Sequence, residues 1–142
     1  MKSFFGYPGG KSRLAKRLLD RIGPVKSYAE PFAGGFSVGL TLLDQSPLPV
    51  WINDLDRDVI CLWKATIYHT DALCDQINRA HITVDTFYRI RDRILSGKTR
   101  PLLDTAIDKL LVHKLSYSNM GEMAASPVGG KNQTGDLNHG TG

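Results

Sequence analysis

The chain has 142 residues, of which 42% are hydrophobic and 23% are charged, and this composition is ordinary for one soluble globular domain. No apolar run approaches the roughly 20 residues of a membrane-spanning helix, and the first residues lack the apolar core of a signal peptide, so we expect a cytoplasmic protein with no membrane partner. Residues 1–26 hold seven basic residues and one acid, a charge of +6, whereas the rest of the chain carries −2.

Residues 11–22 are expected to form a helix that Gly23 and Pro24 end. Leu14, Leu18 and Ile22 repeat every four residues and Ala15 and Leu19 widen this stripe, so we expect these five residues to face the core. A second stripe at the same spacing, directed away from that core, consists of arginines: Arg13, Arg17 and Arg21. A basic N-terminal segment of this kind is typical of proteins that bind a polyanion, and we expect nucleic acid as the partner. The alternative is that the arginines only form a solvent-exposed helix face with no binding role.

The next segment predicts a strand, a helix and a second strand, over residues 27–32, 36–43 and 50–53. A glycine turn at Gly34 and Gly35 follows the first strand, and Asp54 follows the second, as in half of a nucleotide-binding βαβ unit. The glycines would let the backbone approach a ligand, and the acid would suit a ribose diol. Tight packing of the glycines and helix capping by Asp54 are the alternatives.

From residue 54 the pattern is helical, with helices expected over residues 54–68, 69–80, 85–95 and 102–115. The last of these has a well-defined amphipathic pattern. After Tyr117 the chain becomes polar and rich in glycine, and we expect loop or disorder there. Cys61 and Cys74 are expected to be buried thiols, and the four histidines are scattered, so we expect no metal site.

Two segments of the sequence are similar to known nucleotide-binding motifs, but neither segment matches its motif. Lys11 and Ser12 end a segment similar to a P-loop, but the position that needs a glycine is Phe5. Gly34, Gly35 and Gly39 are spaced differently from the dinucleotide fingerprint. A nicotinamide-dependent oxidoreductase is therefore a less favoured alternative.

Joined in this order, three motifs resemble the N-terminal half of the DNA adenine methylase family: Tyr7-Pro8-Gly9-Gly10-Lys11, residues 30–38 and Asn53-Asp54-Leu55-Asp56. The resemblance continues more loosely to residues 126–130, which are similar to the family's target-recognition region. The family transfers a methyl group from S-adenosylmethionine to the exocyclic amino group of adenine in double-stranded DNA. The resemblance implies these cofactor-binding residues: Tyr7, Gly10, Lys11, Glu30, Pro31, Phe32, Ala33, Gly34, Gly35 and Asp54. The basic stripe fits a DNA enzyme, and its candidate DNA contacts are Lys11, Arg13 and Arg17.

The family's chemistry resides in an Asp-Pro-Pro-Tyr motif that holds a flipped adenine. This sequence has no Pro-Pro dipeptide, so we assign no catalytic residue. Because only two strands are convincing, we expect an α/β chain with an incomplete Rossmann-like methyltransferase fold, from a truncated gene and inactive alone. A non-catalytic DNA- or partner-binding remnant is the alternative. The expected parts are a partial cofactor-binding unit (1–68), a helical segment that starts the target-recognition region (69–116) and a Gly-rich tail (117–142).

Overall fold

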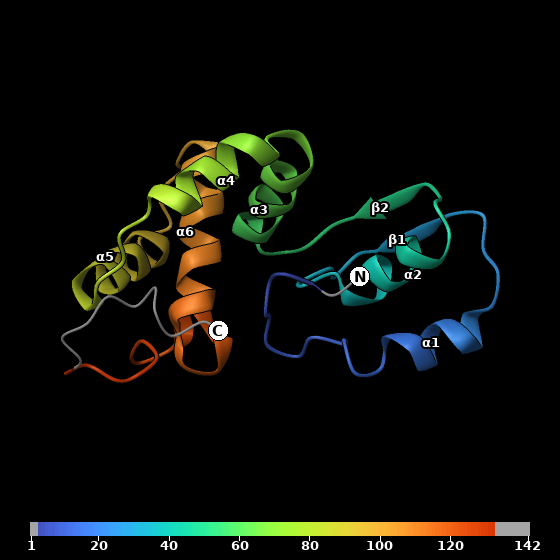
Figure 1. Cartoon of the computed structure of the whole chain (residues 1–142), viewed down its shortest axis with the longest axis horizontal. Helices are drawn as coiled ribbons and strands as arrows, with labels where there is room; N and C mark the ends of the chain where they lie inside the picture. Colours follow the sequence, from blue (N-terminus) through green and yellow to red (C-terminus); the bar gives the residue numbers. More distant parts are fainter. Residues whose placement is uncertain (1–2, 133–142) are drawn as a thin grey trace. The chain divides into compact units, whose positions relative to one another are not determined.

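The computed structural model describes residues 3–132 and divides the chain into two compact units, Met1–Asp56 and Arg57–Gly142, called unit 1 and unit 2 below (Figure 1). Unit 1 is a small α/β unit and unit 2 is helical. The assignment of a cofactor-binding part and a target-recognition part to the sequence stays a prediction. Within the described range, no helix is long and apolar enough to cross a membrane.

Unit 1 contains, in chain order, α1 (Ala15–Ile22), β1 (Tyr28–Glu30), α2 (Ser37–Gln45) and β2 (Val50–Ile52). The two strands pair in parallel, with Tyr28 opposite Val50 and Glu30 opposite Ile52. The strand–helix–strand order therefore agrees with the sequence, although both strands are shorter than expected. The parallel register brings the carboxyl ends of β1 and β2 to the same edge, so the segments that follow them meet there.

Helix α1 corrects two expectations. It begins at Ala15 rather than at residue 11, because residues 12–14 form a turn in which the Leu14 amide donates to the Lys11 carbonyl at 2.9 Å. The stripe expected to face the core is largely open, since Leu14 is 51% exposed and Ile22 48%. The two residues expected to widen the stripe are the ones that are buried in this helix: Ala15 and Leu19 pack with Val38 and Leu42 of α2. The rest of the expected stripe stays exposed because α1 packs against α2 through this narrow face.

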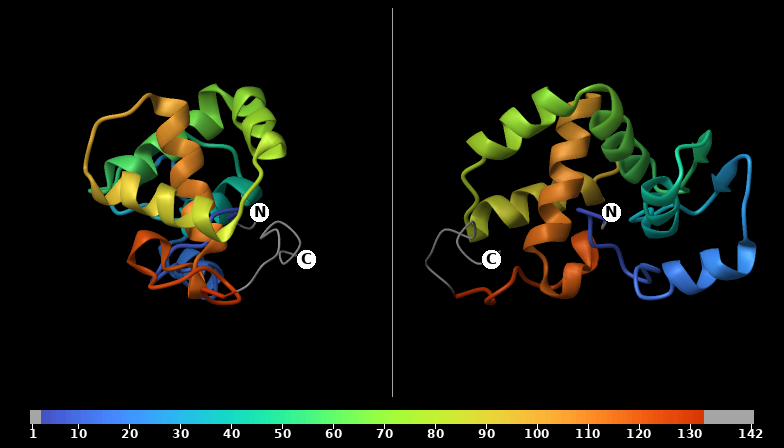
Figure 2. Two further views of the ribbon diagram at one scale, coloured as in Figure 1. Left: turned by 90° about the vertical axis from the view of Figure 1, so that its left-hand side faces the viewer. Right: turned by 45° about the vertical axis from the view of Figure 1, so that its right-hand side comes forward.

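Unit 2 contains α3 (Arg57–Tyr68), α4 (Thr70–Arg79), α5 (Val84–Leu95) and α6 (Leu102–Leu115), followed by two 3₁₀ turns (Tyr117–Asn119 and Gly121–Met123). Both views in Figure 2 show α6, drawn in orange, among the other helices of this unit. Its Val112 and Leu115 complete an apolar cluster with Phe87 and Ile90 of α5. Cys61 is buried as expected, but Cys74 on α4 is exposed.

Helix α6 is not simply amphipathic, because three charged or titratable side chains on it are buried: Asp108, Lys109 and His113. Each has a partner. Asp108 accepts hydrogen bonds from Arg93 and Arg100, and Arg100 also reaches Asp58 of α3 at 3.2 Å. Because neighbouring helices pack on several sides of α6, polar residues that the apolar periodicity places on the solvent face are buried. Ion pairs and hydrogen bonds offset the free-energy cost of burying these polar groups.

The segment after Tyr117 consists, as far as residue 132, of two short 3₁₀ turns and irregular loop, and backbone hydrogen bonds hold it in place. The Val128 amide donates to the Leu115 carbonyl at 2.8 Å, and Ser116 forms an antiparallel bridge with Pro127. Ala124 is also buried. Small apolar residues and hydrogen bonds to the end of α6 supply the order that composition does not indicate. The remainder of the expected disordered tail, from residue 133, lies outside the described residues.

Candidate functional site

The site in unit 1 begins with a tight turn at residues 7–10. The Gly10 amide donates to the Tyr7 carbonyl at 2.9 Å, and Gly9 has a φ of +75°. A type II turn requires a positive φ at its third position, here Gly9, and proline is common at its second position, here Pro8. The turn places Tyr7 and Lys11 against the loop that follows β1.

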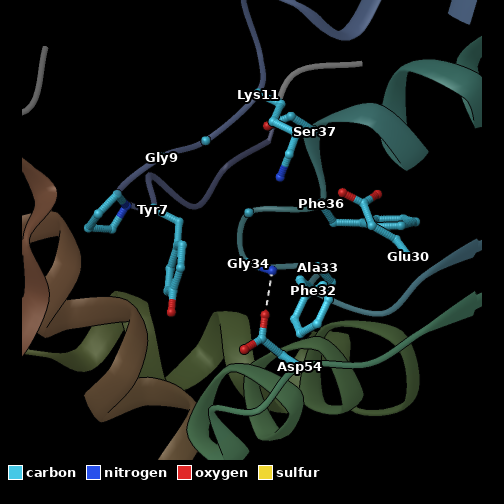
Figure 3. A pocket seen from close by; sticks show the side chains of 13 residues that line it. Tyr7, Gly9, Lys11, Glu30, Phe32, Ala33, Gly34, Phe36, Ser37 and Asp54 are labelled. Carbon is cyan, nitrogen blue, oxygen red and sulfur yellow. Dashed lines mark hydrogen bonds between the residues drawn. The ribbon is translucent and has the colours of Figure 1, made fainter. Parts of the chain in front are cut away.

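Hydrogen bonds from the end of β2 fix the loop that follows β1. The Ala33 amide donates to the Asn53 carbonyl at 2.9 Å, and the Gly34 amide donates to the Asp54 carboxylate at 2.7 Å (dashed line in Figure 3). The other carboxylate oxygen of Asp54 accepts the Asp56 amide at 3.0 Å. Because α3 begins at Arg57, Asp54 is not the residue that caps this helix. Its carboxylate instead joins the two strand ends across 20 positions of sequence.

Packing within unit 1 already requires the two loop glycines. Gly34 has a φ of +46°, and a β-carbon there would lie 2.7 Å from the Tyr7 ring. A β-carbon on Gly35 would lie 2.8 Å from the Phe5 carbonyl oxygen. The glycines therefore let the N-terminal segment approach the loop, which is the packing alternative stated above. Close approach of a ligand is not needed to explain them.

These segments enclose a cavity of about 270 Å³, and Figure 3 shows the side chains around it. Nine of the ten predicted cofactor residues line it: Tyr7, Gly10, Lys11, Glu30, Phe32, Ala33, Gly34, Gly35 and Asp54. Pro31 does not; it borders a separate apolar groove between α1 and β1. The cavity lies just below the range of about 300–1,000 Å³ that is usual for small-molecule sites.

Glu30 is a buried carboxyl at the edge of this cavity. One carboxylate oxygen accepts the Gly39 amide in the first turn of α2 and the Tyr28 hydroxyl, both at 3.2 Å. Burial raises the pKa of Glu30, and these hydrogen bonds and the charge of Lys11 offset the effect only in part. Burial and the neighbouring carboxylate raise the pKa of Tyr28 to about 12. Glu30 therefore ties β1 to α2 in addition to lining the cavity.

Sequence reasoning missed four lining residues: Pro8, Gly9, Phe36 and Ser37. Phe36 is the least expected, because its φ of +49° is a left-handed conformation that non-glycine residues rarely adopt. Its ring is buried over Gly39, whose missing side chain leaves the space. The spacing of an aromatic residue and a glycine three positions later was the signal that could have found this contact.

The predicted basic stripe lies partly in a turn and partly on a helix. Arg13 lies in the turn before α1, whereas Arg17 and Arg21 lie on the helix, and all three are exposed. Lys11 is also exposed and lines the cavity. Within residues 3–132, no three histidine, cysteine, aspartate or glutamate side chains come together as a potential metal site.

A glycine-containing loop after one parallel strand and an acid after the next occur together in many α/β proteins that bind nucleoside-containing ligands. Residues 7–134 match the D12 class N6 adenine-specific DNA methyltransferases, and the chain belongs to this family. It is also 25% identical over 114 residues to the type II methyltransferase M.MjaIII of Methanocaldococcus jannaschii, a match that covers 69% of this chain. The matched part is 39% of the relative's length, so the chain spans about two fifths of that protein.

Proposed function

We propose that unit 1 is the S-adenosylmethionine-binding part of an adenine-specific DNA methyltransferase with a Rossmann-like fold. The observation that supports this most is the convergence of nine predicted cofactor residues on one cavity, closed by the bond from Gly34 to Asp54. S-adenosylmethionine would supply the methyl group for transfer to the exocyclic amino group of adenine.

The residues of the cavity fit this ligand in their chemistry. Asp54 uses one lone pair of each carboxylate oxygen for a backbone amide, and each oxygen can accept a further hydrogen bond, as a ribose diol would require. Tyr7 and Phe32 offer aromatic surface, and Phe32 is 74% exposed. Glu30 and Lys11 provide one negative and one positive group for the amino and carboxylate ends of a methionine moiety.

Removal of the Asp54 carboxylate is expected to weaken binding of S-adenosylmethionine to the full chain by about 1–3 kcal/mol, or roughly 5- to 150-fold in Kd, the usual range for a hydrogen bond to a charged group. Titration calorimetry with Asp54→Ala tests this. Asp20→Ala, which removes an exposed carboxylate from α1, is the matched control and should bind as the wild type does. Equal affinity of Asp54→Ala and wild type would remove Asp54 from the site.

We further propose that Lys11, Arg13 and Arg17 contact the phosphates of duplex DNA without reading its sequence. Neutralising Arg13 and Arg17 together is expected to lower the slope of log K against log[salt] by about 2, because each phosphate contact contributes about 0.9. Fluorescence anisotropy with a duplex of mixed sequence measures this slope.

A matched control comes from unit 2, where Arg79 and Arg89 are exposed and pair with acids four positions earlier. Their double neutralisation removes the same charge and should leave the salt slope unchanged. If the Arg13 and Arg17 variant instead kept the wild-type slope, the stripe would be a solvated surface and its DNA role would be abandoned.

The second candidate function is a non-catalytic DNA-binding or partner-binding protein. The absence of any Pro-Pro dipeptide from the sequence favours it, since the family's adenine-holding motif contains one. This candidate shares the DNA contacts of the first and differs in requiring no cofactor. Calorimetry with S-adenosylmethionine therefore separates the two.

A further inference from the structure

The turn that follows α6 has a backbone that other contacts must stabilise. Ser118 and Asn119 both have a φ of +55°, and Gly121 has a φ of +62°. Consecutive non-glycine residues in the left-handed region are unfavourable and persist only where the surrounding structure determines them. Contacts with the rest of unit 2 must therefore stabilise the backbone of residues 117–123, called the recognition turn below.

The end of α6 holds the first half of the recognition turn. The Nδ1 atom of His113 donates to the Asn119 carbonyl at 3.0 Å, and the Ser116 hydroxyl oxygen accepts the Gly121 amide at 2.7 Å. A β-carbon on Gly121 would overlap the imidazole of His113, so glycine is required at this position. These contacts lie within or next to the buried surface of α6.

A buried ion pair holds the second half. The Lys109 Nζ atom lies 2.7 Å from Oε1 of Glu122, and the Lys109 side chain is only 1% exposed. The other carboxylate oxygen of Glu122 lies 3.7 Å from Nε2 of His113. The Glu122 carbonyl accepts a hydrogen bond from Nε of Arg91 on α5 at 2.9 Å. Glu122 is thus fixed from both α5 and α6.

Above this network the recognition turn presents exposed side chains. Tyr117 is 68% exposed and Met123 is 73% exposed, and the amide and hydroxyl groups of Asn119 and Ser118 are exposed between them. Lys114, one turn earlier on α6, is exposed as well. Apolar wedges, hydrogen-bonding side chains and a nearby cation together suit the grooves and phosphates of DNA.

We propose that Lys109 and Glu122 are positioning residues whose buried ion pair fixes the recognition turn, so that its exposed side chains meet duplex DNA already ordered. This inference rests on the proposed function for its partner. An apolar pair of similar volume could fill the same space without loss of stability, because burying two charges costs as much as their attraction returns. An apolar pair would lack the directional contact between Lys109 and Glu122 that fixes the position of the Glu122 backbone and therefore the conformation of the turn.

The test replaces both charges by apolar groups, in Lys109→Met/Glu122→Leu, within the full chain. We expect a melting temperature close to that of wild type, roughly tenfold faster hydrogen exchange at the Asn119, Met120 and Gly121 amides, and about fivefold weaker binding to a 20-base-pair duplex. The double variant Asp85→Asn/Arg89→Gln removes an exposed ion pair from α5 and is the matched control, with no change in exchange or affinity.

Two results would overturn the inference: wild-type exchange in the turn of the double variant, or faster exchange with unchanged DNA affinity. If the double variant melts well below wild type, exchange and affinity are compared at a lower temperature, at which both proteins are fully folded. A wild-type chain that binds no duplex DNA would overturn the proposed function and the DNA role of the turn. Hydrogen exchange would still decide whether the ion pair fixes the turn, so the two failures are distinguishable.

Discussion

The purified chain, incubated with S-adenosylmethionine and duplex DNA, is expected to transfer no methyl groups. The family's chemistry needs a carboxylate and a carbonyl that hold the amino group of a flipped adenine, and this sequence lacks the Pro-Pro pair of that motif. Neither of the two carboxylates in the cavity replaces these adenine-holding groups. Asp54 accepts two backbone amides, and Glu30 accepts the Gly39 amide and the Tyr28 hydroxyl. Both carboxylates thus hold unit 1 together, and their remaining acceptors are the ones proposed above for the ribose and the methionine amino group of the cofactor.

Incorporation of a tritiated methyl group into DNA measures this directly. A complete adenine methyltransferase in the same buffer is the positive control. Enzymes typically turn over at about 1–1,000 per second, so a turnover of even about 1 per minute by the chain alone would require a catalytic centre that we have not assigned. That rate would reverse the proposal that the chain is inactive by itself.

Gly39→Ala is expected to destabilise unit 1 by about 1–3 kcal/mol, the usual cost of overpacking a core. A β-carbon at this position would overlap three carbons at the far edge of the Phe36 ring. The ring is 4% exposed and its backbone is left-handed, so it has little room to move. Urea unfolding followed by hydrogen exchange of α1 and α2 peptides reports the stability of unit 1.

A second substitution tests the cause. In a Phe36→Leu background the ring atoms that would be overlapped are gone, and alanine is favoured over glycine in a helix by about 1 kcal/mol. Gly39→Ala is therefore expected to become neutral or stabilising there, a reversal of sign that a double-mutant cycle detects. Equal destabilisation in both backgrounds would mean that Phe36 is not what limits position 39.

Long periodic segments were predictable from the sequence. The helix expected over residues 102–115 is α6, and the one expected over 69–80 is α4 to within a residue at each end. Apolar spacing over three turns or more leaves few alternatives to a helix. The meeting of Gly34 and Asp54 was predictable for a different reason, because parallel strands bring their carboxyl ends to one edge.

What the sequence could not predict depends on contacts between elements. The exposed Leu14 and the buried Leu19 on α1 differ because of how α2 packs, which periodicity along one helix does not specify. The order of the segment after Tyr117 comes from buried polar contacts such as Lys109 with Glu122, in a stretch whose composition is typical of disorder. The left-handed backbone of Phe36 likewise accompanies a contact that periodicity does not specify, because its ring occupies the space left by the missing side chain of Gly39.

The position of the cavity along the chain bears on the order of events during synthesis. All of its lining residues lie between Tyr7 and Asp54, inside unit 1. On a ribosome, the last group needed to close the cavity therefore leaves the exit tunnel before α3 does. Domains generally fold as units from the N-terminal side during translation. The Gly34–Asp54 bond can thus form while unit 2 is still being synthesised, and the cavity does not have to wait for the helices that follow it.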